Sequence, residues 1–171
     1  MGYLFDFMLL VLVYFLFFYR KWNRISKQKL AVNTLLYVYI AMVLFVTLMP
    51  FTIPFAGTNN FFWETANFEP FRDLRLNHGG AAKEIFLNVI MMMPFGFLFP
   101  LTTKKGFSST VASTFLFSLM IECAQLLSAW WGDLHSRTFD VTDLITNTTG
   151  ALTDFLLFVV LRPVVSKIIK I

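Results

Sequence analysis

Residues Glu84–Leu101, EIFLNVIMMMPFGFLFPL, decide the fold class of this chain. After Glu84 the stretch carries no charged residue, and a run of this length and apolarity is typical of a transmembrane helix. The rest of the chain has the same character, because its 171 residues are 57% hydrophobic, 18% aromatic and only 14% charged. Such values lie far from those of soluble globular proteins and predict a polytopic membrane protein.

Four further apolar stretches accompany this one, and we predict a membrane helix for each. The five predicted spans are residues 2–19, 30–49, 85–101, 110–131 and 143–161. Because each span uses roughly 20 residues, the remaining chain suffices only for short connections. We therefore expect an all-α helical bundle that forms one domain over residues 1–171. The single cysteine, Cys123, lies in an apolar run and is expected to be a buried, inert thiol.

The basic residues indicate how the bundle is oriented. Ten of the fourteen Lys and Arg residues lie after the first span, after the third span or in the C-terminal tail, and no acidic residue lies there. The positive-inside rule makes these segments cytoplasmic, so the N-terminus is predicted outside and the C-terminus inside. The basic residues follow apolar spans and form no nucleic-acid motif, so no nucleic-acid partner is expected.

The outer segment between the second and third spans, residues 51–84, is too polar to cross the membrane but is rich in Phe and Trp. Aromatic rings favour the level of the lipid headgroups, so we expect this segment to lie in the outer interface. It would serve either as a lid over the bundle or as a surface that binds lipid-like molecules.

Polar residues inside membrane spans cost free energy and often mark function. Glu122 lies nine residues before Trp131, roughly 13 Å below the outer end of the fourth span. Gln125 shares its face one turn nearer the surface. Asn88 lies in the third span, where Pro94 and Gly96 predict a kink or an unwound turn.

The fifth span carries a second polar stripe, formed by Asp143, Asn147, Gly150 and Asp154. With the fourth and fifth helices antiparallel, we expect Glu122 opposite residues 150–154 and Gln125 opposite residues 147–150. Gly150 would then allow close approach to the helix that carries Glu122.

The loop before the fifth span adds charged residues. Asp140 and Asp143 suit the start of a helix, where they would cap free N–H groups and meet the positive end of the helix dipole. Arg137 lies at the same end of the helix pair. His135 with Asp133 is a weak metal pattern, so no metal or other cofactor is predicted.

The combination of these residues resembles the VanZ-like family of bacterial membrane proteins. The resemblance runs from Asn67 to Gly150 and rests on four elements in order: NFEPF; Asn88 followed by PFGFLFP; Glu122 with Gln125; and Arg137 with DVTDLITNTTGA. It implies a multi-pass protein of the bacterial cell membrane, Gram-positive in origin, that lowers sensitivity to lipid-tailed glycopeptides of the teicoplanin type.

Two functions from different classes follow. In the first, an outward-facing polar pocket binds an amphiphile, either a lipoglycopeptide or a lipid-linked cell-wall component, through Asn88, Gln125, Arg137 and Asn147. In the second, the protein is a membrane enzyme that modifies such a precursor, with Glu122 and Asp140 or Asp143 as acid and base. A transporter is a third candidate, but five helices without a repeat make a poor carrier. Oligomeric state is not encoded in any recognisable pattern.

Overall fold

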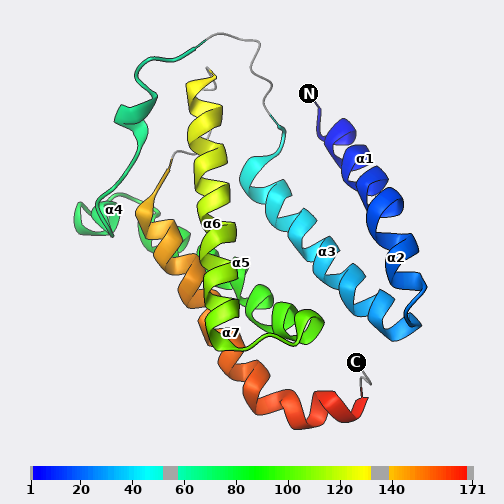
Figure 1. The fold of residues 1–171 in the computed structure, drawn as a ribbon. Coiled ribbons are helices and arrows are strands. Elements are labelled where there is room, and N and C mark those ends of the chain that lie inside the picture. Colours follow the sequence, from blue (N-terminus) through cyan, green and yellow to red (C-terminus); the bar gives the residue numbers. More distant parts are fainter. Residues whose placement is uncertain (1, 52–57, 132–138, 169–171) are drawn as a thin grey trace.

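The computed structural model describes residues 2–51, 58–131 and 139–168. All long secondary-structure elements among these residues are helices (Figure 1). Five helices are long and apolar enough to cross a membrane, namely Tyr3–Asn23, Lys27–Leu48, Ala81–Thr103, Phe107–Trp130 and Val141–Lys167. The predicted all-α bundle with five spans is therefore confirmed. The predicted orientation across the membrane stays a prediction.

The first span consists of three consecutive helical pieces, α1 (Tyr3–Val13), the π-helical turn η1 (Tyr14–Tyr19) and α2 (Arg20–Asn23). It runs antiparallel to α3 (Lys27–Leu48), as Figure 1 shows. Two hydroxyls join the pair: Tyr37 donates to the Leu10 carbonyl at 2.7 Å, and Tyr14 lies 2.6 Å from the Thr34 hydroxyl. Such bonds give two apolar helices a defined register in a solvent that is itself apolar.

The other three spans, α5 (Ala81–Thr103), α6 (Phe107–Trp130) and α7 (Val141–Ile168), form the remainder of the bundle. α5 and α7 cross at two glycines. A Cβ added at Gly96 would lie 1.9 Å from the Ala151 carbonyl oxygen, and one at Gly150 would lie 2.1 Å from that of Val89. The backbones of these two helices are therefore in direct contact.

This contact corrects the predicted role of Gly150. The glycine was expected to face the helix of Glu122, which is α6, but its neighbours belong to Val89 of α5. Of the kink or unwound turn expected at Pro94 and Gly96, the unwound turn is absent, because α5 is α-helical from Ala81 to Thr103 through both of its prolines. Close packing against α7 supports the helix where a proline would otherwise favour a break.

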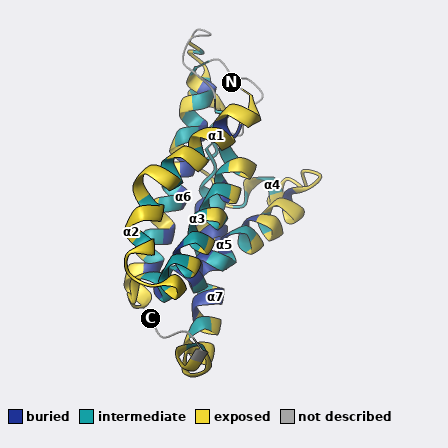
Figure 2. Cartoon of the chain, turned by 90° about the vertical axis from the view of Figure 1, so that its right-hand side faces the viewer, coloured by how far each residue is buried: buried dark blue, intermediate teal, exposed yellow. Residues whose placement is uncertain are grey.

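Burial in this protein is inverted relative to a soluble domain (Figure 2). A small apolar core joins Val43 of α3, Met92 of α5 and Ile121 of α6. Many large apolar side chains face outward, for instance Met120 at 70% and Val160 at 73% exposure. Lipid tails are as apolar as these side chains, so such a surface suits the membrane interior. Cys123 is exposed as well, which makes the expectation of a buried thiol wrong, because its side of α6 faces away from the other helices.

Two short helices, η2 (Phe62–Thr65) and α4 (Arg72–Arg75), lie in the outer segment between α3 and α5. Figure 1 shows that α7 begins well below the outer end of α6. The outer segment runs from the end of α3 down to the level at which α7 begins. It therefore contacts the first residue of α7.

Candidate functional site

The first turn of α7 is held by two carboxylates. Asp140 caps the helix, because its Oδ1 accepts a hydrogen bond from the Thr142 backbone N–H at 2.6 Å. Glu122 of α6, which is 1% exposed, accepts from the backbone N–H of Asp140 itself at 2.8 Å. Both carboxyl groups thus lie at the positive end of the α7 dipole, where hydrogen-bond acceptors are favourable.

The outer segment docks on the same turn. Asn67 donates from its backbone N–H to the Phe139 carbonyl at 2.7 Å and accepts from the Val141 N–H at 3.0 Å, forming an isolated parallel β-bridge. Its side-chain amide donates to Oδ2 of Asp140 at 3.0 Å. Four residues later the Phe71 N–H donates to the Thr142 hydroxyl at 3.0 Å. The NFEPF stretch is therefore anchored to the helix start by backbone as well as side-chain bonds.

Three aromatic rings of the outer segment are largely exposed. Phe61, Trp63 and Phe68 are 67%, 58% and 58% exposed, and Phe68 packs on Phe139 with 5.3 Å between ring centroids. One side of the segment thus covers the start of α7, while the other presents rings outward. The two expected roles, a lid or a surface that binds lipid-like molecules, both stay predictions.

The observed register of α6 and α7 corrects the predicted one. Glu122 meets Asp140, and the Asn147 amide donates to the Ser118 hydroxyl at 2.8 Å. The expected pairing of Glu122 with residues 150–154 is wrong, because Asp140 lies beside a residue eight positions before the end of α6. At 1.5 Å per residue, α7 therefore begins roughly 12 Å below that end.

Gln125 has a different neighbour from the one expected. Its amide donates to the Thr47 carbonyl of α3 at 3.2 Å, so it does not meet residues 147–150 of α7. Two buried amide oxygens, Oε1 of Gln125 and Oδ1 of Asn147, lack a hydrogen-bond partner among the described residues. Buried polar atoms are almost always satisfied in native proteins, so these two acceptors mark places where water or a ligand donor would gain a hydrogen bond.

A small cavity lies beside the helix start, between α4, α5 and α7. Its acidic lining residues are Asp73, Glu84, Asp140 and Asp143. A volume of about 20 Å³ holds about one water molecule and no acyl chain. In the described part of the chain, no group of three His, Cys, Asp or Glu side chains has the geometry to hold a metal ion.

The other candidate residues are distributed as follows. Asn88 is buried in α5 at 8% exposure. Pro94 lies in the same helix, one turn after Ile90. Three candidate residues lie outside the described part of the chain, namely Asp133, His135 and Arg137. The site described above therefore does not include them.

Some contributors were not singled out from the sequence. Thr110, Thr114 and Ser118 continue the Glu122 face at intervals of four residues, and all three are buried. This i, i+4 pattern of small hydroxyl residues was a readable signal. Asn67 and Thr142 were recognised only as members of the NFEPF and DVTDLITNTTGA motifs, and their bonding role was missed because it depends on how a distant segment docks.

Comparison with known proteins places this chain in a family. The model of the VanZ/LLP1 family matches residues 5–162. The chain belongs to the VanZ/LLP1 family. The resemblance inferred from Asn67 to Gly150 is thus confirmed, and the VanZ/LLP1 match also covers the first two spans, where no signature was recognised.

One curated relative carries the family name. The chain is 28% identical over 123 residues to Protein VanZ of Enterococcus faecium, a match that covers 71% of this chain and 70% of that protein. No solved structure matches the chain. Membership in the VanZ/LLP1 family and the five apolar helices together make this a membrane protein.

Proposed function

We propose that this protein acts in the cell envelope of a Gram-positive bacterium and lowers sensitivity to lipid-tailed glycopeptide antibiotics of the teicoplanin type. The proposal places it in the cell membrane, with the outer segment and the start of α7 on the external face. Family membership and the similarity to Protein VanZ support it.

The mechanism we propose is binding of an amphiphile at the outer mouth of the bundle. The amphiphile is either the antibiotic or a lipid-linked cell-wall component. The observation that carries this proposal is the junction of Asn67, Asp140 and Glu122, which ties the outer segment to α6 and α7. Buried polar groups are concentrated there in an otherwise apolar bundle, and convergent polar groups of this kind can fix the orientation of a ligand.

Each half of an amphiphile has a counterpart in this region. The exposed rings of Phe61, Trp63 and Phe68 offer apolar contact at headgroup level. Arg137, which precedes Phe139 by two residues in the sequence, would pair with phosphate or carboxylate through its planar fork. The free oxygens of Gln125 and Asn147 would accept hydrogen bonds from hydroxyl or amide groups.

Antibiotic protection tests this proposal. The chain is expressed in a teicoplanin-sensitive Gram-positive host, and the minimal inhibitory concentration is measured for wild type, Glu122→Gln and Arg137→Ala at equal membrane levels. Both substitutions should remove most of the protection. Glu64→Gln is the matched control, because this outer carboxylate is exposed and should keep protection intact. Full protection by both test variants would refute the binding mechanism.

The second candidate is a membrane enzyme that modifies a lipid-linked precursor. The observation in its favour is the small cavity where Asp140 and Asp143 meet Glu84 and Asp73, because paired carboxylates supply acid and base catalysis. In this alternative Glu122 and Asp140 or Asp143 share the two roles. Purified protein incubated with lipid-linked cell-wall precursors would change their mass, and Asp143→Asn would abolish the change; unchanged masses with wild type would exclude this alternative.

A further inference from the structure

The C-terminal turns of α7 lie at the opposite end from the junction with the outer segment. They turn away from the axis of the rest of the helix. The helix has 28 residues, and at 1.5 Å each they measure roughly 42 Å, more than the roughly 30 Å thickness of a hydrocarbon core. Figure 1 shows the last turns running sideways, and Figure 2 shows them nearly end-on at the base of the molecule. Pro163 lies in the second half of α7, and a proline there removes the hydrogen bond to the Val159 carbonyl and favours a bend.

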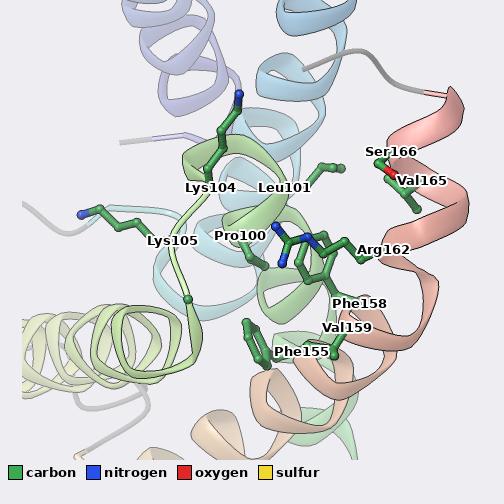
Figure 3. A pocket seen from close by; sticks show the side chains of 11 residues that line it. Pro100, Leu101, Lys104, Lys105, Phe155, Phe158, Val159, Arg162, Val165 and Ser166 are labelled. Carbon is green, nitrogen blue, oxygen red and sulfur yellow. The ribbon is translucent and has the colours of Figure 1, made fainter.

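A cavity lies in the angle of this bend. Its volume is about 340 Å³, and it is bordered by the last turn of α5, the connection from α5 to α6 and the second half of α7 (Figure 3). Apolar side chains form its walls, including Pro100, Leu101, Phe155 and Phe158. Phe155 is buried at 7% exposure. The cavity is thus of the size that ligand sites have, with fixed apolar walls.

Three cations border the cavity, and no acidic residue does so among the described residues that line it. Arg162 comes from α7, and Lys104 and Lys105 come from the connection. In Figure 3 the Arg162 guanidinium lies between Pro100 and Phe158, while the two lysine side chains extend outward from the connection. None of the three forms an ion pair with a carboxylate in residues 2–51, 58–131 or 139–168.

Because the cavity has apolar walls and lies at the basic end of the spans, a fitting ligand would combine an anionic group with an apolar chain. We propose that it binds an anionic glycerophospholipid of the cytoplasmic leaflet. The phosphate would be held by the Arg162 fork, with Lys104 and Lys105 supplying attraction at the rim, and an acyl chain would follow the wall formed by Phe155 and Phe158. Basic pockets between membrane helices on the cytoplasmic side bind lipid headgroups in this way.

General attraction to an anionic membrane would also use these charges, so the proposal needs a control that keeps the net charge equal. The pocket variant carries Arg162→Gln, Lys104→Gln and Lys105→Gln. The control carries Arg20→Gln, Lys21→Gln and Arg24→Gln, which removes three positive charges from α2 and the residue that follows it. All six side chains are exposed, so neither triple creates a cavity in the core.

The measurement is native mass spectrometry of the full-length chain in mixed micelles, titrated with phosphatidylglycerol or phosphatidylcholine. Wild type should retain phosphatidylglycerol in preference to phosphatidylcholine. The pocket triple should lose phosphatidylglycerol affinity by about tenfold or more, since each basic side chain near a lipid surface contributes measurably to binding, and the control triple should stay within about twofold of wild type. Equal losses in both triples, or no loss in the pocket triple, would overturn the proposal.

Two further arms locate the ligand in the cavity. Phe158→Ala keeps all three charges and should still weaken phosphatidylglycerol binding, whereas an unchanged affinity would contradict the predicted path of the acyl chain. Glycerophosphoglycerol, which is the headgroup without acyl chains, should bind far more weakly than the lipid. If it competes as well as the lipid, the site is a phosphate site and the lipid proposal fails.

Discussion

At the scale of single residues, the protein concentrates its polar bonding at the first turn of α7. Asp140 receives the Thr142 N–H on one oxygen and the Asn67 amide on the other, and its own N–H is bound by Glu122. Each bond satisfies a group that would otherwise be unpaired near the membrane interior, where an unsatisfied polar group costs a few kcal/mol. These residues are therefore structural at the same time as they are candidates for function.

Substitution of Asp140 tests this arrangement. Asp140→Ala should destabilise the start of α7 by roughly 1 kcal/mol, because a capping acceptor is lost, whereas Asp140→Asn keeps an acceptor and should cost less. Hydrogen exchange should report faster exchange of the Thr142 and Asn67 amides in the alanine variant. Glu64→Ala, at an exposed position, provides the comparison. Identical exchange in the two alanine variants would mean that the cap does not hold the outer segment.

At the scale of elements, direct backbone contact between α5 and α7 organises the bundle. Gly96 and Gly150 lie on opposite sides of this contact, each one facing a carbonyl of the other helix. Without a hydrophobic effect between helices in lipid, close packing of small residues is a main source of association.

A methyl group at either glycine should force the two helices apart. Gly96→Ala and Gly150→Ala should each lower the free energy of unfolding by about 1–3 kcal/mol, since backbone atoms would have to move. Gly79→Ala is the matched control, because a Cβ there meets nothing within 4 Å and should change stability by less than about 0.5 kcal/mol. Denaturant titration of the purified protein in detergent measures all three. An unchanged free energy of unfolding in both Gly96→Ala and Gly150→Ala would contradict the importance of this backbone contact.

At the scale of the whole molecule, two ends of the bundle carry different chemistry. One end has the aromatic outer segment and the carboxylates at the α7 start, and the other has the basic connections and the bend of α7. A membrane protein with this asymmetry is expected to have one orientation, with the basic end in the cytoplasm.

Cysteine labelling checks this orientation. In a Cys123→Ser background, a cysteine at Glu64 should react with a membrane-impermeant maleimide in intact cells. A cysteine at Lys21 should react only after the cells are permeabilised, because it lies on the predicted inner side. Both native side chains are exposed, so access does not depend on unfolding. The reverse pattern would invert the topology and place the proposed amphiphile site inside the cell.

Much of the fold could be predicted because membrane insertion depends on local composition. Five spans, a single helical bundle and the polar stripes of α6 and α7 follow from runs of apolar residues and from spacings of three and four. The capping position of Asp140 was readable for the same reason, since a cap depends on neighbours two residues away. Cys123 was misjudged because an apolar run does not distinguish a side facing lipid from a side facing protein.

The amino-acid sequence by itself determined that this chain is a bundle of membrane helices from the VanZ-like family, because hydropathy and motif order are local properties of the chain. Only the tertiary structure decided that Glu122 meets Asp140, that Gly150 contacts Val89 and that Asn67 docks on α7. Helix register depends on where two backbones approach most closely, and loop docking depends on groups brought together from distant segments. Neither is specified by periodicity within one helix.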